Sequence, residues 1–176
     1  MSLTQDNTRA ATTPARRAEI VREYGPFDGT HLYQIAEARI DKIDPATGHV
    51  VATIPAPGEG RDSGLAWAEG SLWVGQYRER RIHKIDPATG AIQRTIESNR
   101  FVTGVTWVDG ELWHGTWDGD DSDIRRIDPA SGAVLERLEM PTGTGVSGLE
   151  SDGADLFYAG GGQSGKVRAV RRPKAR

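Results

Sequence analysis

Short apolar runs that alternate with polar positions follow one another along the chain, and glycine-containing turns separate them. None of these runs repeats apolar residues at i, i+3 and i+4 over the length of a helix, so the pattern favours strands. Glu69-Gly70 supplies a left-handed backbone position for a tight hairpin, and Asp86 with Pro87 and Gly90 has the composition of a second turn. Around these turns the sequence predicts four strands, at residues 64–68, 71–77, 81–86 and 91–97.

The same unit recurs at a fixed spacing of 42 residues. The string IDPATG stands at residues 43–48 and 85–90, IDPASG stands at 127–132, and a weaker copy lies at 166–173. A repeat of about 40–45 residues with four antiparallel strands is typical of a β-propeller blade. We therefore predict an all-β, β-propeller-like fold of about four blades of ~42 residues each.

The first and last blades are incomplete in this alignment of repeats. The fourth unit ends after its third strand, and Gly29 follows Tyr24 by five residues, whereas Gly70 follows Ile54 by 16. Residues 19–24 resemble an outer strand, so they either complete the last blade or replace the missing inner strand of the first. We expect a small closed ring or an open arc, and exposed strand edges favour a homodimer.

Composition excludes several classes of protein. The chain of 176 residues has no cysteine, which excludes a disulfide framework, a thiolate metal site and a cysteine nucleophile. The net charge is −3, which does not favour a nucleic-acid partner. No apolar run can span a membrane and the N-terminal residues lack a secretory signal, so we expect a cytoplasmic protein. We divide it into a disordered tail at 1–17, the propeller-like domain at 18–172 and a basic tail at 173–176.

One segment carries a resemblance to a known group of proteins. Residues 110–117 read Gly-Glu-Leu-Trp-His-Gly-Thr-Trp and run on to Ile127 and Gly132 of the turn motif. This unit resembles the bacterial propeller superfamily that includes virginiamycin B lyase, the SMP-30/gluconolactonase group and glutamine cyclotransferase, and it is most similar to the last. The resemblance, over residues 27–172, implies a propeller fold, whereas members of the superfamily differ in their chemistry.

The candidate catalytic residues depart from the pattern of the glutamine cyclotransferase family. That family has a glutamate in a Gly-Glu-Gly-Leu motif on an inner strand, and Ser63 stands at the corresponding position here. Because serine is a weak base, we expect no cyclisation of glutaminyl peptides. Asp62 and Glu150 are carboxylates near this position, and His114 lies at the centre of a predicted strand. These three are our acid–base candidates, with a buried packing role as the alternative for His114.

Hydroxyl and aromatic side chains provide candidate ligand-binding residues. Ser63, Thr103 and Ser147 precede equivalent inner strands, where they either face the propeller axis or bond only to the backbone. Tyr77 and Trp117 end equivalent second strands near a mouth of the propeller, where aromatic rings can stack on a flat ligand.

A metal site is not expected, and the sequence implies no cofactor. Residues 118–123 begin like a calcium-binding loop, with Asp118 and Asp120 as the first ligands, but Asp123 and Pro129 replace the glycine and glutamate that such a loop needs. We interpret the segment as a solvated acidic hairpin, at which a divalent cation would bind only adventitiously.

Two functions follow from these residues. In the first, the channel binds a small polar molecule, with or without catalysing acyl transfer, cyclisation or elimination. In the second, the protein is a non-catalytic module whose exposed blade faces bind a partner or a second copy. Clustering of Asp62, Thr103, Ser147 and Glu150 at one mouth would favour an enzyme over such a module.

Overall fold

The computed structural model describes residues 26–174, whose regular structure is β-strand apart from a single 3-10 turn, η1 (Gly162–Ser164). No helix in this part of the chain is long and apolar enough to cross a membrane.

Four antiparallel sheets contain the strands. Sheet 1 is β1 (Leu32–Ala36), β2 (Arg39–Ile43) and β3 (Val50–Pro55). Sheet 2 is β4 (Asp62–Ala68), β5 (Ser71–Gln76), β6 (Arg81–Ile85) and β7 (Ile92–Glu97). Sheet 3 is β8 (Phe101–Val108), β9 (Glu111–Asp118), β10 (Asp121–Ile127) and β11 (Val134–Glu139), and sheet 4 is β12 (Gly148–Ser151), β13 (Leu156–Gly160) and β14 (Val167–Arg171).

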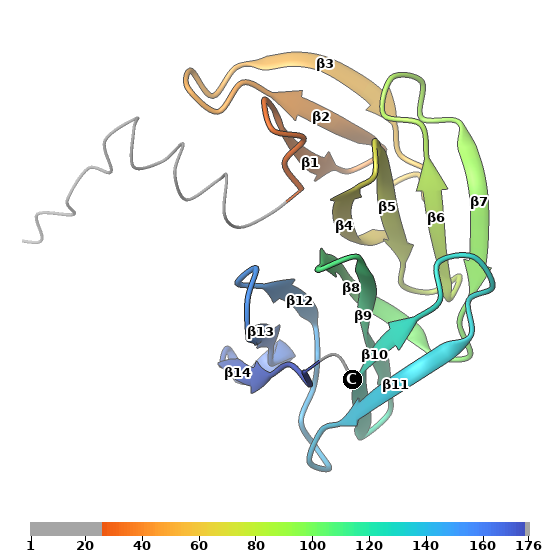
Figure 1. The fold of residues 1–176 in the computed structure, drawn as a ribbon, viewed down its shortest axis with the longest axis vertical. Coiled ribbons are helices and arrows are strands. Elements are labelled where there is room, and N and C mark those ends of the chain that lie inside the picture. The colour runs from red at the N-terminus through yellow and green to blue at the C-terminus, as the bar shows by residue number, and fades with distance from the viewer. Residues whose placement is uncertain (1–25, 175–176) are drawn as a thin grey trace, which may run out of the picture.

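Each sheet is a blade that runs outward from the centre of the molecule (Figure 1). The strands β4, β8 and β12 lie near the centre, and β3, β7 and β11 lie at the rim. Sheets 2 and 3 have the four predicted strands, sheet 1 lacks the inner strand and sheet 4 lacks the outer one. The prediction of about four blades with incomplete first and last blades is therefore confirmed. Residues 19–24 lie outside the described residues.

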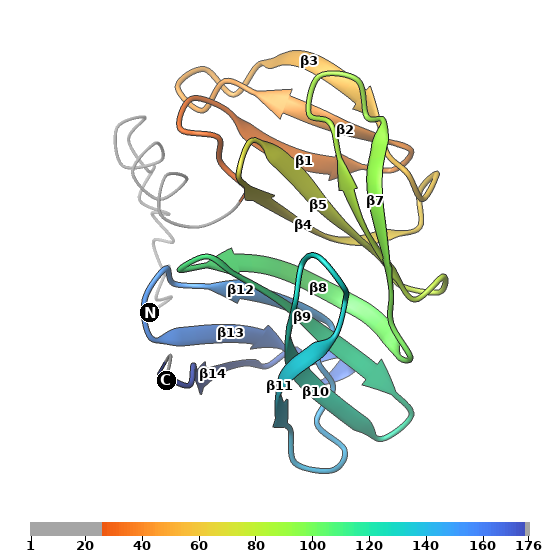
Figure 2. The ribbon, with the colours of Figure 1, turned by 45° about the vertical axis from the view of Figure 1, so that its right-hand side comes forward.

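The sheets pack in chain order around an arc. Strand β1 packs against β4, both β4 and β5 pack against β8, and β12 packs against β8. Among residues 26–174, no comparable packing joins sheet 4 to sheet 1, and Figure 2 shows sheets 1 and 2 on one side of the molecule and sheets 3 and 4 on the other. The homodimer expected from the open ends stays a prediction.

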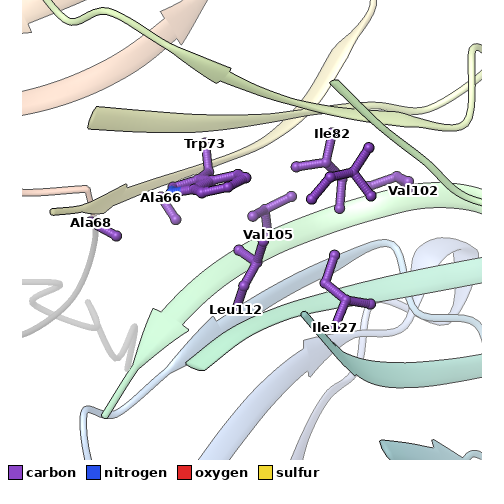
Figure 3. Close-up of a cluster of buried hydrophobic side chains, with 9 residues drawn as sticks. Ala66, Ala68, Trp73, Ile82, Val102, Val105, Leu112 and Ile127 are labelled. Atoms are coloured by element: carbon purple, nitrogen blue, oxygen red, sulfur yellow. The ribbon is translucent and has the colours of Figure 1, made fainter. Parts of the chain in front are cut away.

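Aromatic pairs join each sheet to the next. The ring centroids of Tyr33 and Trp67 are 5.4 Å apart between sheets 1 and 2, and those of Trp73 and Trp107 are 6.2 Å apart between sheets 2 and 3. Figure 3 shows the second interface, where Trp73 and Ile82 face Val105 from the opposite sheet. Trp73 and Trp113, which occupy equivalent positions in β5 and β9, are both buried.

Glycines allow the inner strands to approach backbone to backbone. A Cβ atom added at Gly64 would lie 2.5 Å from the amide nitrogen of Val105, and one added at Gly104 would lie 2.3 Å from that of Leu149. Real Cβ atoms do not approach other atoms so closely. The Gly-aliphatic pair that recurs as Gly64-Leu65 and Gly104-Val105 is thus explained by a close approach of β4 to β8 and of β8 to β12.

Alanine at Gly104 should therefore destabilise the protein by about 1–3 kcal/mol through overpacking. The neighbouring Gly148 provides a matched control, because a Cβ atom there meets nothing within 4 Å and its φ is not in the left-handed region. Gly148→Ala should leave the free energy of unfolding unchanged or raise it slightly. Urea denaturation of both variants measures the difference, and equal stability of the two would contradict the packing argument.

Candidate functional site

Several of the predicted site residues lie at one end of the sheets. The strands are antiparallel, so the beginning of each inner strand lies beside the end of the strand that follows it; Asp62 pairs with Gln76, for example, and Gly148 with Gly160. This end of the molecule, called the mouth below, carries Ser63 and Ser147 at the start of inner strands. Tyr77 and Trp117 lie at the end of second strands, as predicted.

Two of the three predicted hydroxyls bond to the backbone. Ser63 Oγ donates a hydrogen bond to the carbonyl oxygen of Val102 at 2.6 Å and so joins sheet 2 to sheet 3. Ser147 Oγ accepts one from the amide of Gly162 at 2.9 Å. Thr103 Oγ1 is buried and has no partner among the described residues. Hydrogen bonding to the backbone, the alternative to a ligand-binding role, thus accounts for the contact of Ser63. Ser147 also bonds to the backbone, but it borders a pocket as well.

A pocket of about 250 Å³, called the mouth pocket below, lies between sheets 3 and 4. Its wall contains Trp117 at the end of β9, Ser147, and the glycine-rich hairpin that joins β13 to β14. The full lining consists of Trp117, Gly143, Gly145, Ser147, Gly161, Gly162, Gln163, Ser164 and Arg168. Gly162 has a φ of +55°, in the left-handed region that glycine adopts without strain, and this turns the hairpin over the pocket.

Arg168 is the one charged residue in the lining of this pocket. Its ladder partner is Ala159, and the equivalent pairings place Ile82 beside Gly75 and Ile124 beside Gly115. The corresponding residues of the other three repeats, Ile40, Ile82 and Ile124, are completely buried. A guanidinium therefore stands where the repeat has a core isoleucine, and its Nη1 is buried without a hydrogen-bond partner among the described residues.

An aromatic cluster continues from the pocket along the mouth. The rings of Tyr77 and Phe101 stack with centroids 4.8 Å apart, and those of Tyr77 and Trp117 are 6.5 Å apart and tilted. The guanidinium of Arg80 lies 4.5 Å from the centroid of Phe101. Tyr77 and Trp117, which were predicted separately, thus belong to one surface, and Trp117 is the member that borders the pocket.

The two predicted carboxylates do not form a pair. Asp62 Oδ2 accepts a hydrogen bond from the amide of Gly58 at 3.1 Å, and a register shift in the β4–β5 ladder follows this residue. Glu150 accepts from the Thr106 hydroxyl at 2.8 Å and from the Ser151 amide at 3.0 Å. Burial raises the pKa of both carboxyl groups above their usual range. Neither residue lines the mouth pocket. Asp62 begins β4 at the mouth, whereas Glu150 lies toward the other end of β12, so the expected cluster of the two carboxylates at one mouth is not formed.

His114 is separated from both carboxylates. It is buried at the interface of sheets 2 and 3 and borders another cavity, together with Asn99 and Arg125. Burial, followed by the charge of Arg125, lowers the pKa of His114 to about 4. The three acid–base candidates therefore occupy three environments rather than one.

The acidic hairpin with Asp118 and Asp120 forms the turn between β9 and β10, and both of these residues are exposed. Within residues 26–174, no group of three or more His, Cys, Asp or Glu side chains is arranged to hold a metal ion.

Known structures share the arrangement of blades. Glutaminyl cyclase from Myxococcus xanthus superposes with a TM-score of 0.66 and 17% identity, over 83% of this chain and 70% of that protein. Virginiamycin B lyase from Staphylococcus aureus gives 0.55 and 15%, over 86% of this chain and 55% of the lyase. The computationally designed protein Ika4 gives 0.54 and 16%, over 97% and 99% of the two chains. The chain folds as a β-propeller. No protein-family model matches the sequence, and no curated protein matches it.

This propeller covers about half the length of the lyase, and the low identities establish the fold alone. The candidate site must therefore be judged from its own residues. Trp117 and Ser147 are candidates from the sequence that border the pocket, whereas Arg168 was missed. Its signal is present in the sequence, because a charged residue at a repeat position held by isoleucine departs from the pattern.

Proposed function

We propose that the protein is a binding module for a small, flat, anionic molecule, an aromatic carboxylate, which occupies the mouth pocket. The buried and unpartnered Nη1 of Arg168 carries this proposal. A buried guanidinium donor without a partner is costly, and a carboxylate satisfies it through charge-assisted hydrogen bonds. A fold that needed only packing at this position would use isoleucine, as the other three repeats do.

The rest of the lining supports a flat and small ligand. The indole of Trp117 offers a ring face, and the glycine-rich hairpin lets a ligand approach the backbone closely. Drug-sized ligands occupy pockets of about 300–1,000 Å³. A volume of about 250 Å³ therefore suits a molecule with a single ring.

Binding is favoured over catalysis by the chemistry of the lining. A general acid or base has to reach the reacting group within hydrogen-bond distance. The lining contains glycine, serine, glutamine, tryptophan and arginine, and it contains no carboxylate or histidine. Asp62, Glu150 and His114 lie elsewhere, so the site can hold and orient a ligand without an acid–base group.

Titration with benzoate and benzamide, followed by NMR of the Trp117 indole, tests the proposal. We expect benzoate to shift the Trp117 signal and to bind about tenfold or more tightly than the neutral benzamide, because a hydrogen bond to a charged group is worth more. Arg168→Gln should remove this preference. Arg171→Gln, an exposed position on the same strand, should keep it.

Two results would overturn the proposal. One is the absence of a benzoate-induced shift at millimolar concentration, and the other is equal affinity of the wild type and Arg168→Gln for benzoate. Circular dichroism of both arginine variants verifies that they are folded.

A further inference from the structure

A second cavity, of about 200 Å³, lies between sheets 2 and 3, away from the mouth pocket. Its apolar wall contains Ile82 and Ile96 from sheet 2 and Ile127 from sheet 3. Figure 3 shows Ile82 and Ile127 on opposite sides of this interface. The polar part of the wall contains Glu97, whose carboxylate pairs with Arg81 at 2.9 Å, together with Ser98, Asn99, His114 and Arg125. Asn99 is exposed, so the cavity reaches the surface of the molecule.

The fold does not require a histidine at the position of His114. The position of His114 is occupied by Val74 in sheet 2, and the position of Arg125 is occupied by Asp41 in sheet 1 and His83 in sheet 2. Yet His114 is 2% exposed and Arg125 is 1% exposed. Burying a histidine and a guanidinium beside each other has a desolvation cost that a valine at this position avoids. The position of Arg125 is polar and buried in sheets 1, 2 and 3, so the departure from the repeat lies at His114, a buried histidine where sheet 2 has a buried valine.

Positive charge predominates around Arg125. Its Nε and Nη2 donate to the carboxylate of Asp123 at 2.7 and 3.0 Å, and its Nη1 donates to Asn99 Oδ1 at 2.6 Å. The guanidinium groups of Arg100 and Arg137 lie 3.2 and 3.3 Å from the same carboxylate. One carboxylate therefore faces three guanidinium groups. Arg125 also has five N–H bonds, of which three are used, so it can donate to an anion in the cavity.

His114 supplies a hydrogen-bond acceptor of defined position. Its Nδ1 lies 3.3 Å from the carbonyl oxygen of Gly115, a contact that requires the proton on Nδ1. Burial, followed by the charge of Arg125, lowers the pKa of His114 to about 4, so the ring is neutral at pH 7. Nε2 then carries a lone pair, and it has no partner among residues 26–174.

We propose that this cavity binds a short-chain aliphatic hydroxycarboxylate. The carboxylate accepts hydrogen bonds from Arg125, the hydroxyl donates to Nε2 of His114, and the alkyl group packs against the three isoleucines. A volume of about 200 Å³ is enough for a four- or five-carbon acid of this kind and too small for a drug-sized ligand.

Isothermal titration with 2-hydroxyisovalerate and isovalerate tests the proposal, because the two probes differ only in the hydroxyl. We expect 2-hydroxyisovalerate to bind about tenfold more tightly, since isovalerate leaves Nε2 of His114 without a donor. His114→Val, which introduces the residue of sheet 2, should reduce binding of 2-hydroxyisovalerate to the level of isovalerate. The imidazole ¹⁵N signal of His114 should shift when the hydroxy acid is added to the wild type.

His49→Val, at an exposed position, is the matched control and should bind both probes like the wild type. Arg168→Gln should also bind them like the wild type, which separates this cavity from the mouth pocket. Equal affinity of the two probes, unchanged binding to His114→Val, or no binding at millimolar concentration would overturn the proposal. In the last case the cavity holds water only.

Discussion

Asp123→Asn is expected to lower the free energy of unfolding by about 3–5 kcal/mol, because it leaves buried guanidinium charge without its carboxylate. Asp123 is 1% exposed and contacts three arginines and the Thr116 hydroxyl. Chemical denaturation measures the loss. Asp121→Asn is the matched control, because Asp121 lies two residues earlier on the same strand and is exposed. This variant should change the free energy of unfolding by less than about 0.5 kcal/mol. A loss below about 1 kcal/mol for Asp123→Asn would show that the cluster is dispensable.

The same aspartate makes stability dependent on pH. Burial alone would raise the pKa of Asp123, but the hydrogen bonds from Arg125 and Thr116, with the charges of Arg125 and Arg100, hold the pKa below its ordinary value of 3.8. A lowered pKa in the folded state means that the contribution to stability is present above pH 3.8 and is lost as the pH falls through the folded-state pKa. The difference in stability between the wild type and Asp123→Asn should therefore shrink in acid.

Trp113→Ala is expected to cost about 3–5 kcal/mol as a large-to-small change in the core. Trp113 is completely buried, its ring lies 4.9 Å from that of Phe157 between sheets 3 and 4, and its indole donates to Glu111 at 3.0 Å. Tyr158→Ala provides the control, because Tyr158 is 40% exposed on the other face of sheet 4. The control should cost less than about 1 kcal/mol in urea denaturation. Similar losses for the two variants would mean that Trp113 is not part of the core.

The sequence predicts the blades well because equivalent residues make equivalent contacts in each repeat. The Asp-Pro turns recur, and the structure gives them a local reason. Asp44 and Asp86, for instance, accept hydrogen bonds from amides two residues later, at 2.8 and 2.9 Å. Such contacts involve neighbouring residues, so their signal lies within a short stretch of sequence.

The candidate site was less predictable, because it depends on contacts between blades. Asp62 and Glu150 are candidates as carboxylates near the motif position, and His114 as a histidine at a strand centre, but such positions do not tell which face or cavity the side chain meets. Arg168 departs from the repeat, at a position that the ladder shows to be a core isoleucine elsewhere. The register of β13 with β14 places this arginine beside the pocket. The weak fourth copy of the repeat does not fix that register.

Strand order has a consequence for how the chain reaches its native state. Every sheet consists of strands that are consecutive in the chain, so the backbone hydrogen bonds of one sheet need only one repeat to have been synthesised. Domains of nascent chains fold from the N-terminal end during translation, and repeat proteins gain stability from each contact with the preceding unit. Sheet 2 can therefore form before sheet 3 leaves the ribosome. The contact between Trp73 and Trp107 then forms as sheet 3 packs against sheet 2. The sheets therefore assemble one after another, beginning at the N-terminal end.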